Sequence, residues 1–523
     1  MTRTDNVKRN LIFNMIKYAT QLVLQFVLRT VLIYVMGAEY IGLNGLFTNI
    51  FSFLSLTELG IGSAIVFSMY KPIAENDIEK VKTLQNLYKK FYSIIIIVIF
   101  ALGMVLTPFL KFFVNGEVPS DINIYVLFVM YLLNTLVGYF CAHKRSLLFA
   151  YQRNDVENKI RTFCLLLSTV LQVIVLLVFK NYYVYFSISI LFMVVECVLI
   201  YRTANKMYPE IRGKSNPLDA DTKKEVVKNV TALSMHKIGS AVVFSTDNIL
   251  TSIFCGIVVL GAYSNYSLIT AALTSMFALF INALQGSVGN LVASQTNEYA
   301  YSRFKVLRLI FSYLSAFTTI CLVVLLQPFI KLWTNDAIYL LDFSTVILIC
   351  LSFYFSRMRV SVGTFKDAAG LFWNNKWMPI AESLVNLGVS IVLGYFMGIN
   401  GIFIGTIVST LVAPFWVEPY VLYKHYFKRG VADYFKRYVL DFIIMLGACA
   451  VCYFVCSLIP DGNIWLLIAK FAACIALSNV LLILAYFKTK EFKDLWKMGK
   501  GMLGKIFKKK QVDQSPVEEQ KNN

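Results

Sequence analysis

Charged side chains interrupt several long apolar runs of this chain, and they are the residues that could bind a charged ligand. Lys17 and Arg29 lie in the first run, Glu58 lies in the second, and Arg145 lies at the end of the fourth. A charge deep in a membrane-spanning helix costs about 3 kcal/mol, so such a residue usually faces a cavity or a partner. These positions are therefore candidates for binding and ion coupling.

The cations near the N-terminus suit an anionic cargo. A guanidinium, as on Arg29 or Arg145, grips phosphate oxygens in a bidentate manner, and an ammonium, as on Lys17, acts as a point charge. The diphosphate of a lipid-linked sugar has the matching chemistry. The alternative is that Lys17, Lys144 and Arg145 extend to the headgroups of the inner leaflet.

The segment from Ser234 to Asn248 is the most polar of the runs and contains His236 and Asp247. On a helix these two residues lie about 20° apart in projection and about 16 Å apart along the axis, so they share one face. That face either lines water or forms a buried structural pair with another helix. Asp247 is the main candidate for binding Na⁺ or H⁺, and Glu58 and His236 are further candidates; no other cofactor is expected.

The composition requires that most of these residues contact lipid. The chain has 523 residues, of which 58% are hydrophobic and 15% charged, and its mean hydropathy is +0.65. Because lipid offers no partners for backbone groups, apolar runs of about 20 residues can cross a membrane only as helices. The sequence predicts an all-α polytopic protein with about fourteen transmembrane helices, at roughly 10–36, 40–70, 89–114, 122–150, 159–179, 184–204, 228–254, 258–292, 304–328, 340–360, 377–397, 400–423, 437–459 and 464–487.

The positions of Lys and Arg predict the topology. The net charge of +19 could suggest nucleic-acid binding, but most of the 49 basic residues lie in alternate connections and in the tail. This asymmetry is typical of the cytoplasmic side of a membrane protein. We therefore expect both termini in the cytoplasm, short outer turns such as Gly37-Ala-Glu39, and no nucleic-acid partner.

The residue pattern contains no sign of an enzyme or a metal site. The ten cysteines lie in or beside apolar runs, which favours packing over disulfides or metal binding. No Gly-x-x-x-x-Gly-Lys-Ser/Thr loop is present for a nucleotide. A membrane-embedded glycan polymerase or ligase stays a competing interpretation, although its catalytic groups would need a larger outer loop.

A glycine pattern suggests that the chain repeats itself. The Gly37 to Gly42 turn has a counterpart at Gly256 to Gly261, with the same spacing of its two glycines. Both hairpins run in the same direction through the membrane, which predicts a parallel repeat. We expect six-helix lobes at 1–204 and 228–425, a cytoplasmic linker at 205–227, two extra helices at 426–488, and a basic amphipathic tail at 489–523.

Several stretches resemble one known group of proteins. They run from Arg29 to Phe47, from Glu58 to Ile65, from His236 to Ser240, from Thr246 to Asn248, and from Asn386 through Gly388 to Gly398–Thr406. They are similar to the multidrug/oligosaccharidyl-lipid/polysaccharide exporter superfamily, and within it to the Wzx-type flippases of bacterial polysaccharide gene clusters. The resemblance spans nearly the whole chain and includes no catalytic motif.

The resemblance implies a flippase of the bacterial cell membrane. Its cargo would be undecaprenyl-diphosphate-linked oligosaccharide, which it would move by alternating access around a central cavity. Its partners would be membrane lipids, polysaccharide polymerases and glycosyltransferases. In related lipid II flippases, cavity cations hold the diphosphate, which implies this role for Arg29 and, by a looser match, for Lys17, Arg145 and Lys237. A drug/cation antiporter of the same superfamily is the second interpretation, although it would favour an acidic cavity.

Overall fold

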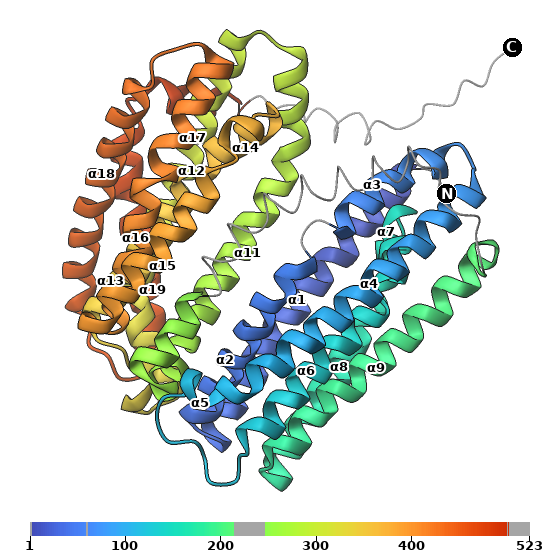
Figure 1. The fold of residues 1–523 in the computed structure, drawn as a ribbon. Helices are drawn as coiled ribbons and strands as arrows, with labels where there is room; N and C mark the ends of the chain where they lie inside the picture. The colour runs from blue at the N-terminus through green and yellow to red at the C-terminus, as the bar shows by residue number, and fades with distance from the viewer. Residues whose placement is uncertain (1–2, 59–60, 214–245, 499, 501–523) are drawn as a thin grey trace, which may run out of the picture. The chain divides into compact units, whose positions relative to one another are not determined.

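The computed structural model describes residues 3–58, 61–213, 246–498 and 500, and these residues contain helices and no strands (Figure 1). Within them, 12 helices are long and apolar enough to cross a membrane. Of the two other predicted helices, 40–70 is divided and 228–254 lies mostly outside the described residues. The all-α membrane fold expected from the sequence is confirmed.

The first half of the described chain forms helices joined mostly by short turns. Their bounds are α1 Arg3–Val35, α2 Ala38–Leu54, α3 Ile61–Ala74, α4 Ile78–Leu106, α5 Leu110–Phe113, α6 Ile124–Phe140, α7 Ala142–Ala150, α8 Asn154–Phe179 and α9 Tyr182–Met207. Short 3₁₀ turns lie at η1 Ser55–Glu58, η2 Thr107–Phe109 and η3 Pro209–Ile211.

The second half follows the same plan and adds two long helices at its end. After a helical stretch at 246–255 come α11 Ile257–Ser294, α12 Asn297–Thr334, α13 Phe343–Met358, α14 Val360–Ala368, α15 Met378–Met397, α16 Ile399–Val412, α17 Pro414–Leu422, α18 Ala432–Ser457 and α19 Ile464–Tyr486. Three short elements complete it, η4 Ala337–Tyr339, η5 Trp373–Asn375 and the π-helical η6 Tyr423–Phe427. Residues 490–498 of the predicted tail are helical, and the tail beyond residue 500 lies outside the described residues.

Side chains next to the helix ends explain several boundaries. Asp77 caps α4 by accepting a hydrogen bond from the Lys80 amide at 2.9 Å, and Asn123 and Asn181 cap α6 and α9 in the same way. Such caps satisfy amides that the first turn of a helix leaves without partners. The expected helix 40–70 is instead interrupted, because the last turn of α2 passes into the 3₁₀ turn Ser55–Glu58 and α3 starts only at Ile61.

Helix boundaries in the two halves recur at nearly constant spacing. The equivalent first residues are Ala38 of α2 and Ile257 of α11, Ile78 of α4 and Asn297 of α12, Ile124 of α6 and Phe343 of α13, and Ala142 of α7 and Val360 of α14. The first three pairs are each 219 residues apart and the fourth is 218 residues apart. The nine-residue helices α7 and α14, which the sequence analysis did not separate, belong to this pattern. The agreement supports a parallel repeat.

The paired glycine turns explain how the repeats meet. Gly37 and Gly256 have φ of 106° and 89°, a region in which glycine is favoured because it lacks a Cβ. Five residues further on, a Cβ on Gly42 would lie 1.9 Å from the Ile257 carbonyl oxygen, and one on Gly261 would lie 2.2 Å from the Ala38 carbonyl oxygen. The start of each helix therefore approaches the backbone of its counterpart more closely than any larger residue would permit.

The chain forms two compact units. The first comprises Met1–Met276, Ile330–Leu348 and Lys376–Pro414, and the second comprises Phe277–Phe329, Ile349–Asn375 and Phe415–Asn523. The helices α11, α12 and α13 each contribute to both units. The six-helix lobes at 1–204 and 228–425, with the separate segments at 205–227, 426–488 and 489–523, stay a prediction.

Candidate functional site

Arg29 lies on α1 among tyrosines of the first unit. The guanidinium is within electrostatic range of four phenol groups, Tyr131 of α6, Tyr182 and Tyr185 of α9, and Tyr339 of η4. Two of these, Tyr131 and Tyr182, are hydrogen-bonded to each other at 3.1 Å. The Nη1 atom of Arg29 is buried and has no hydrogen-bond partner among the described residues. A buried guanidinium nitrogen without a hydrogen bond is unfavourable in free energy, so a ligand that supplies a hydrogen-bond acceptor would stabilise this site.

Arg145, which the sequence offered as a second cavity cation, is paired with an acid. Its Nη2 lies 2.7 Å from Oε1 of Glu196, on α9, and the Glu196 side chain is only 9% exposed. Lys17, Glu157 and Glu196 lie within electrostatic range of one another. Lys17 and Arg145 therefore belong to one cluster of mixed charge, which also includes Arg161, and two carboxylates offset part of its positive charge.

Glu58 ends a chain of hydroxyl groups that reaches α7. The Tyr92 hydroxyl donates to the Glu58 carboxylate, the Tyr88 hydroxyl lies 3.1 Å from that of Tyr92, and Ser146 lies 2.9 Å from Tyr88. Glu58 and Arg145 line the same cavity, which has a volume of about 380 Å³. The structure thus brings together an ion-coupling candidate and a cargo candidate that are far apart in the sequence.

Asp247 meets polar side chains from two later helices. Its Oδ2 accepts a hydrogen bond from the Thr406 hydroxyl of α16 at 2.8 Å, and Asn386 of α15 donates to the same hydroxyl at 3.0 Å. The other carboxylate oxygen, Oδ1, is buried and has no hydrogen-bond partner among the described residues. Carboxylate, hydroxyl and amide oxygens are the ligands that a hard cation such as Na⁺ prefers, and a proton on Oδ1 would also relieve the buried charge.

Two of the predicted site residues are not placed. His236 and Lys237 lie outside the described residues, so the shared face of His236 and Asp247 stays a prediction. Among the residues that the structure does describe, no three His, Cys, Asp or Glu side chains gather into a cluster that could hold a metal ion.

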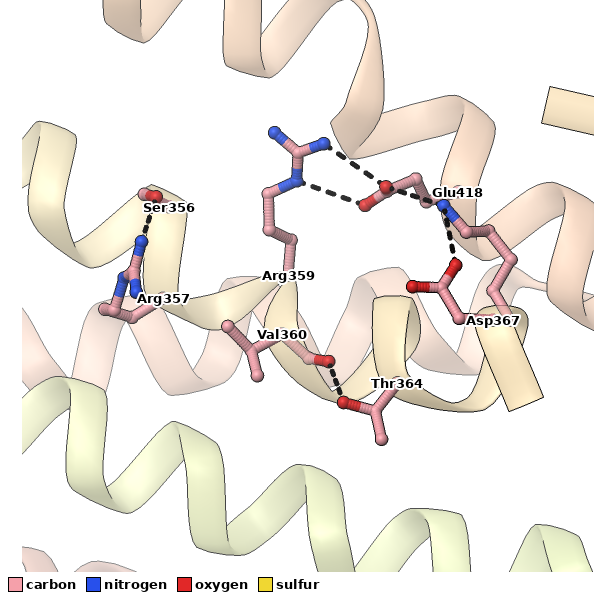
Figure 2. A network of polar contacts seen from close by, with 8 residues as sticks. Ser356, Arg357, Arg359, Val360, Thr364, Asp367 and Glu418 are labelled. Atoms are coloured by element: carbon pink, nitrogen blue, oxygen red, sulfur yellow. Dashed lines mark hydrogen bonds and ion pairs between the residues drawn. The ribbon is translucent and has the colours of Figure 1, made fainter. Parts of the chain in front are cut away.

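The second unit contains an ion cluster that the sequence analysis missed. Figure 2 shows Arg359, at the junction of α13 and α14, facing Glu418 of α17 with two hydrogen bonds of 3.1 and 3.2 Å. Lys366 of α14 lies 3.1 Å from the same carboxylate. Glu418 is a charge within an apolar run of the sequence, but nothing in the spacing of the chain identifies its partners.

The two ion pairs occupy similar positions in the repeat. Arg145 lies on α7, the short helix that follows α6, and Arg359 and Lys366 flank or belong to α14, the short helix that follows α13. In each half the partner carboxylate comes from a later helix, Glu196 of α9 or Glu418 of α17. These pairs stabilise the packing of the short helices and satisfy charges that would otherwise be buried alone.

Comparison with known proteins supplies the fold relationship. No family model matches the chain, and no curated protein matches it in sequence. The lipid II flippase MurJ in an inward closed conformation superposes with a TM-score of 0.64 at 14% identity, over 91% of this chain and 98% of that one. An inward-facing multidrug resistance MATE family transporter of the MOP superfamily superposes with a TM-score of 0.59 at 14% identity, over 76% of this chain and 94% of that one.

An outward-facing MATE transporter of the same superfamily superposes less closely. Its TM-score is 0.52 at 11% identity, over 80% of this chain and 95% of that one. The chain therefore has the fold of MOP superfamily transporters, as the sequence analysis expected. These three structures are of transporters and a flippase rather than of enzymes.

Proposed function

We propose that this protein is a flippase that moves undecaprenyl-diphosphate-linked oligosaccharide from the inner to the outer leaflet of the bacterial cell membrane. The observation that carries the proposal is the guanidinium of Arg29, which has a buried nitrogen without a hydrogen-bond partner among the described residues and lies within electrostatic range of four tyrosine hydroxyls. A diphosphate supplies the acceptor oxygens that this nitrogen lacks. The likeness in fold to a lipid II flippase over 91% of the chain supports the same cargo class.

The aromatic surroundings suit the rest of such a cargo. Tyrosine combines a ring that packs on apolar or sugar surfaces with a hydroxyl that forms hydrogen bonds. Tyr182 and Tyr185 could therefore accompany a headgroup held at Arg29. Lys17 and Arg145 contribute less in this proposal, because Arg145 is paired with Glu196 and Lys17 lies within electrostatic range of Glu157 and Glu196.

Ion coupling is proposed at Asp247. Binding of Na⁺ or H⁺ would satisfy Oδ1, which has no hydrogen-bond partner among the described residues, and the hydrogen bond to Thr406 would transmit the change to α16. Because a ligand shifts a conformational equilibrium only through different affinities for the two states, ion binding can drive alternating access if the site changes between them. Polysaccharide polymerases and glycosyltransferases are the further partners that this proposal implies.

The test is translocation in proteoliposomes that contain a short undecaprenyl-diphosphate oligosaccharide. An external sugar-modifying enzyme reports how much cargo reaches the outer leaflet. We expect protein-dependent translocation that falls at least tenfold in Arg29→Ala and less in Arg29→Lys, which keeps the charge and loses the bidentate geometry. Arg202→Ala, which removes an exposed arginine of α9, is the matched control.

A drug/cation antiporter is the second candidate, because Glu58 and three tyrosines line one cavity of about 380 Å³. A carboxylate beside aromatic rings can bind an organic cation. Uptake of a lipophilic fluorescent cation by the same proteoliposomes separates the two functions. Cation transport that Glu58→Gln abolishes, together with no movement of the lipid-linked sugar, would replace the flippase proposal.

A further inference from the structure

A second cavity lies among α4, α7, the end of α9 and the turn that follows it. Its volume is about 430 Å³, within the usual range of ligand sites. It shares no lining residue with the cavity of Glu58 and Arg145. Its lining residues are Gln85, Asn86, Lys89, His143, Lys144, Tyr201, Asn205, Ile211, Arg212 and Gly213.

Lys144 is the most unusual residue of this cavity. It is only 6% exposed, yet its ammonium has neither a hydrogen bond nor an ion pair with any described residue. Within the described residues, its ammonium lies over the ring of Tyr201, whose centroid is 5.4 Å from Nζ. The ammonium of a largely buried lysine favours a compensating charge, and an aromatic ring supplies only part of it.

The charged groups near Lys144 increase its need for a compensating negative charge. In the part of the chain that the structure describes, the charged groups within electrostatic range of Lys144 are Lys89 and Arg212, and both are cations. Among the described residues, the lining of the cavity contains no aspartate or glutamate. By contrast, Arg145, the next residue along the chain, has its carboxylate partner at 2.7 Å. The cavity of Lys144 therefore gathers cations and has no anion among the described residues that line it.

Hydrogen bonds hold the cavity walls together. Gln85 of α4 donates to the His143 carbonyl of α7 at 2.7 Å, and Asn86 donates to the Gly213 carbonyl at 3.1 Å. Arg212 donates to the Asn205 carbonyl at 2.5 Å. These bonds link three separate stretches of the chain. The fold therefore holds the cations close together although they repel one another.

We propose that this cavity binds a phosphate-bearing anion, as the headgroup of an anionic lipid or as a soluble phosphate monoester. The ammonium of Lys144 provides a point charge and the guanidinium of Arg212 a planar donor group, a combination suited to phosphate oxygens. The site lies where α9 ends at Met207, on the side that the distribution of Lys and Arg predicts to be cytoplasmic. Basic pockets between helices at this level suit anionic headgroups. The proposal does not depend on the cargo proposed above.

Thermal unfolding of the full-length protein in detergent tests the site. The probes are short-chain phosphatidylglycerol, short-chain phosphatidylcholine as the zwitterionic control, and glycerol phosphate. A ligand that binds only the folded state raises the unfolding temperature with its concentration, which provides an apparent Kd. We expect phosphatidylglycerol to bind at least tenfold more tightly than phosphatidylcholine.

Variants distinguish binding in this cavity from non-specific electrostatic attraction of the anion to the protein. Lys144→Gln should weaken phosphatidylglycerol binding at least tenfold, and Lys144→Arg should retain most of it. Lys90→Gln removes an exposed cation of α4 that does not line the cavity, and it should leave the Kd unchanged. Arg212→Gln changes an exposed side chain, so it provides a second test if Lys144→Gln does not fold.

The outcomes have distinct meanings. Binding of phosphatidylglycerol that is lost in Lys144→Gln or Arg212→Gln supports the lipid source, whereas equal binding of glycerol phosphate with the same losses supports the soluble source. The proposal is overturned if neither anion raises the unfolding temperature. It is also overturned if Arg212→Gln retains full affinity, or if Lys90→Gln loses as much affinity as the cavity variants.

Discussion

Gly42 and Gly261 occupy equivalent positions in the two halves, and each lies against the first residue of the other's helix. Gly42 of α2 approaches the carbonyl of Ile257, which begins α11, and Gly261 of α11 approaches the carbonyl of Ala38, which begins α2. A contact that two equivalent segments make reciprocally is a sign of two-fold pseudo-symmetry. The hairpins predicted to face outward are thus joined by backbone contacts that tolerate no side chain.

This contact predicts a large effect of a single methyl group. Gly42→Ala should destabilise the protein by about 1–3 kcal/mol, because its Cβ would be placed 1.9 Å from the Ile257 oxygen and the backbones must separate. Gly286→Ala is the matched control, since no atom outside its own helix backbone lies within 4 Å of its Cβ position. The measurement is thermal unfolding in detergent, and equal stability of the two variants would contradict the close approach.

The pair of Arg145 and Glu196 predicts a non-additive double variant. Arg145→Gln or Glu196→Gln alone leaves a mostly buried charge without its partner and should cost up to about 3 kcal/mol. The double variant should lose less stability than the sum of the two, because no lone charge remains. Additive losses in unfolding measurements would show that the two groups do not interact.

The cluster around Glu418 predicts an order of effects among its members. Glu418→Gln removes the carboxylate that Arg359 and Lys366 share and should cost about 3–5 kcal/mol (Figure 2). Lys366→Gln should cost less, since Arg359 keeps both of its hydrogen bonds to Glu418. Unfolding temperatures compare the two variants, and a greater loss in Lys366→Gln would be inconsistent with this geometry.

The contacts of Asp247 predict how coupling depends on them. If the proposed role is right, Asp247→Asn should abolish the dependence of transport on a Na⁺ or pH gradient, because the amide neither carries the charge nor takes up the ion. Thr406→Val removes the hydroxyl that donates to Oδ2 and should weaken the dependence, whereas Thr406→Ser keeps this hydroxyl and should preserve it. Transport is compared with and without each gradient in proteoliposomes. The control is Thr410→Val, which removes a hydroxyl that donates to the Thr406 carbonyl oxygen. Unchanged coupling in Asp247→Asn would remove this residue from the mechanism.

The sequence alone determined the class of structure and the place of the main turns. Apolar runs of sufficient length can only be helices in lipid, and the constraint acts on each run separately. For this reason the predicted helices agree with the described ones, apart from the interruption near Glu58 and the separate short helices α7 and α14. The spacing of Gly37 and Gly42, repeated at Gly256 and Gly261, also identified the hairpins that later proved to meet.

Only the tertiary structure decided which charges face one another. Arg145 and Glu196 are 51 residues apart, and Thr406 is 159 residues from Asp247, so no local pattern connects them. Lys144 and Arg145 are neighbours in sequence, yet one lies near two other cations and the other faces a carboxylate. Helical periodicity determines the direction of a side chain relative to its own helix, whereas the partner it meets depends on how whole helices pack, and that packing is a property of the complete fold.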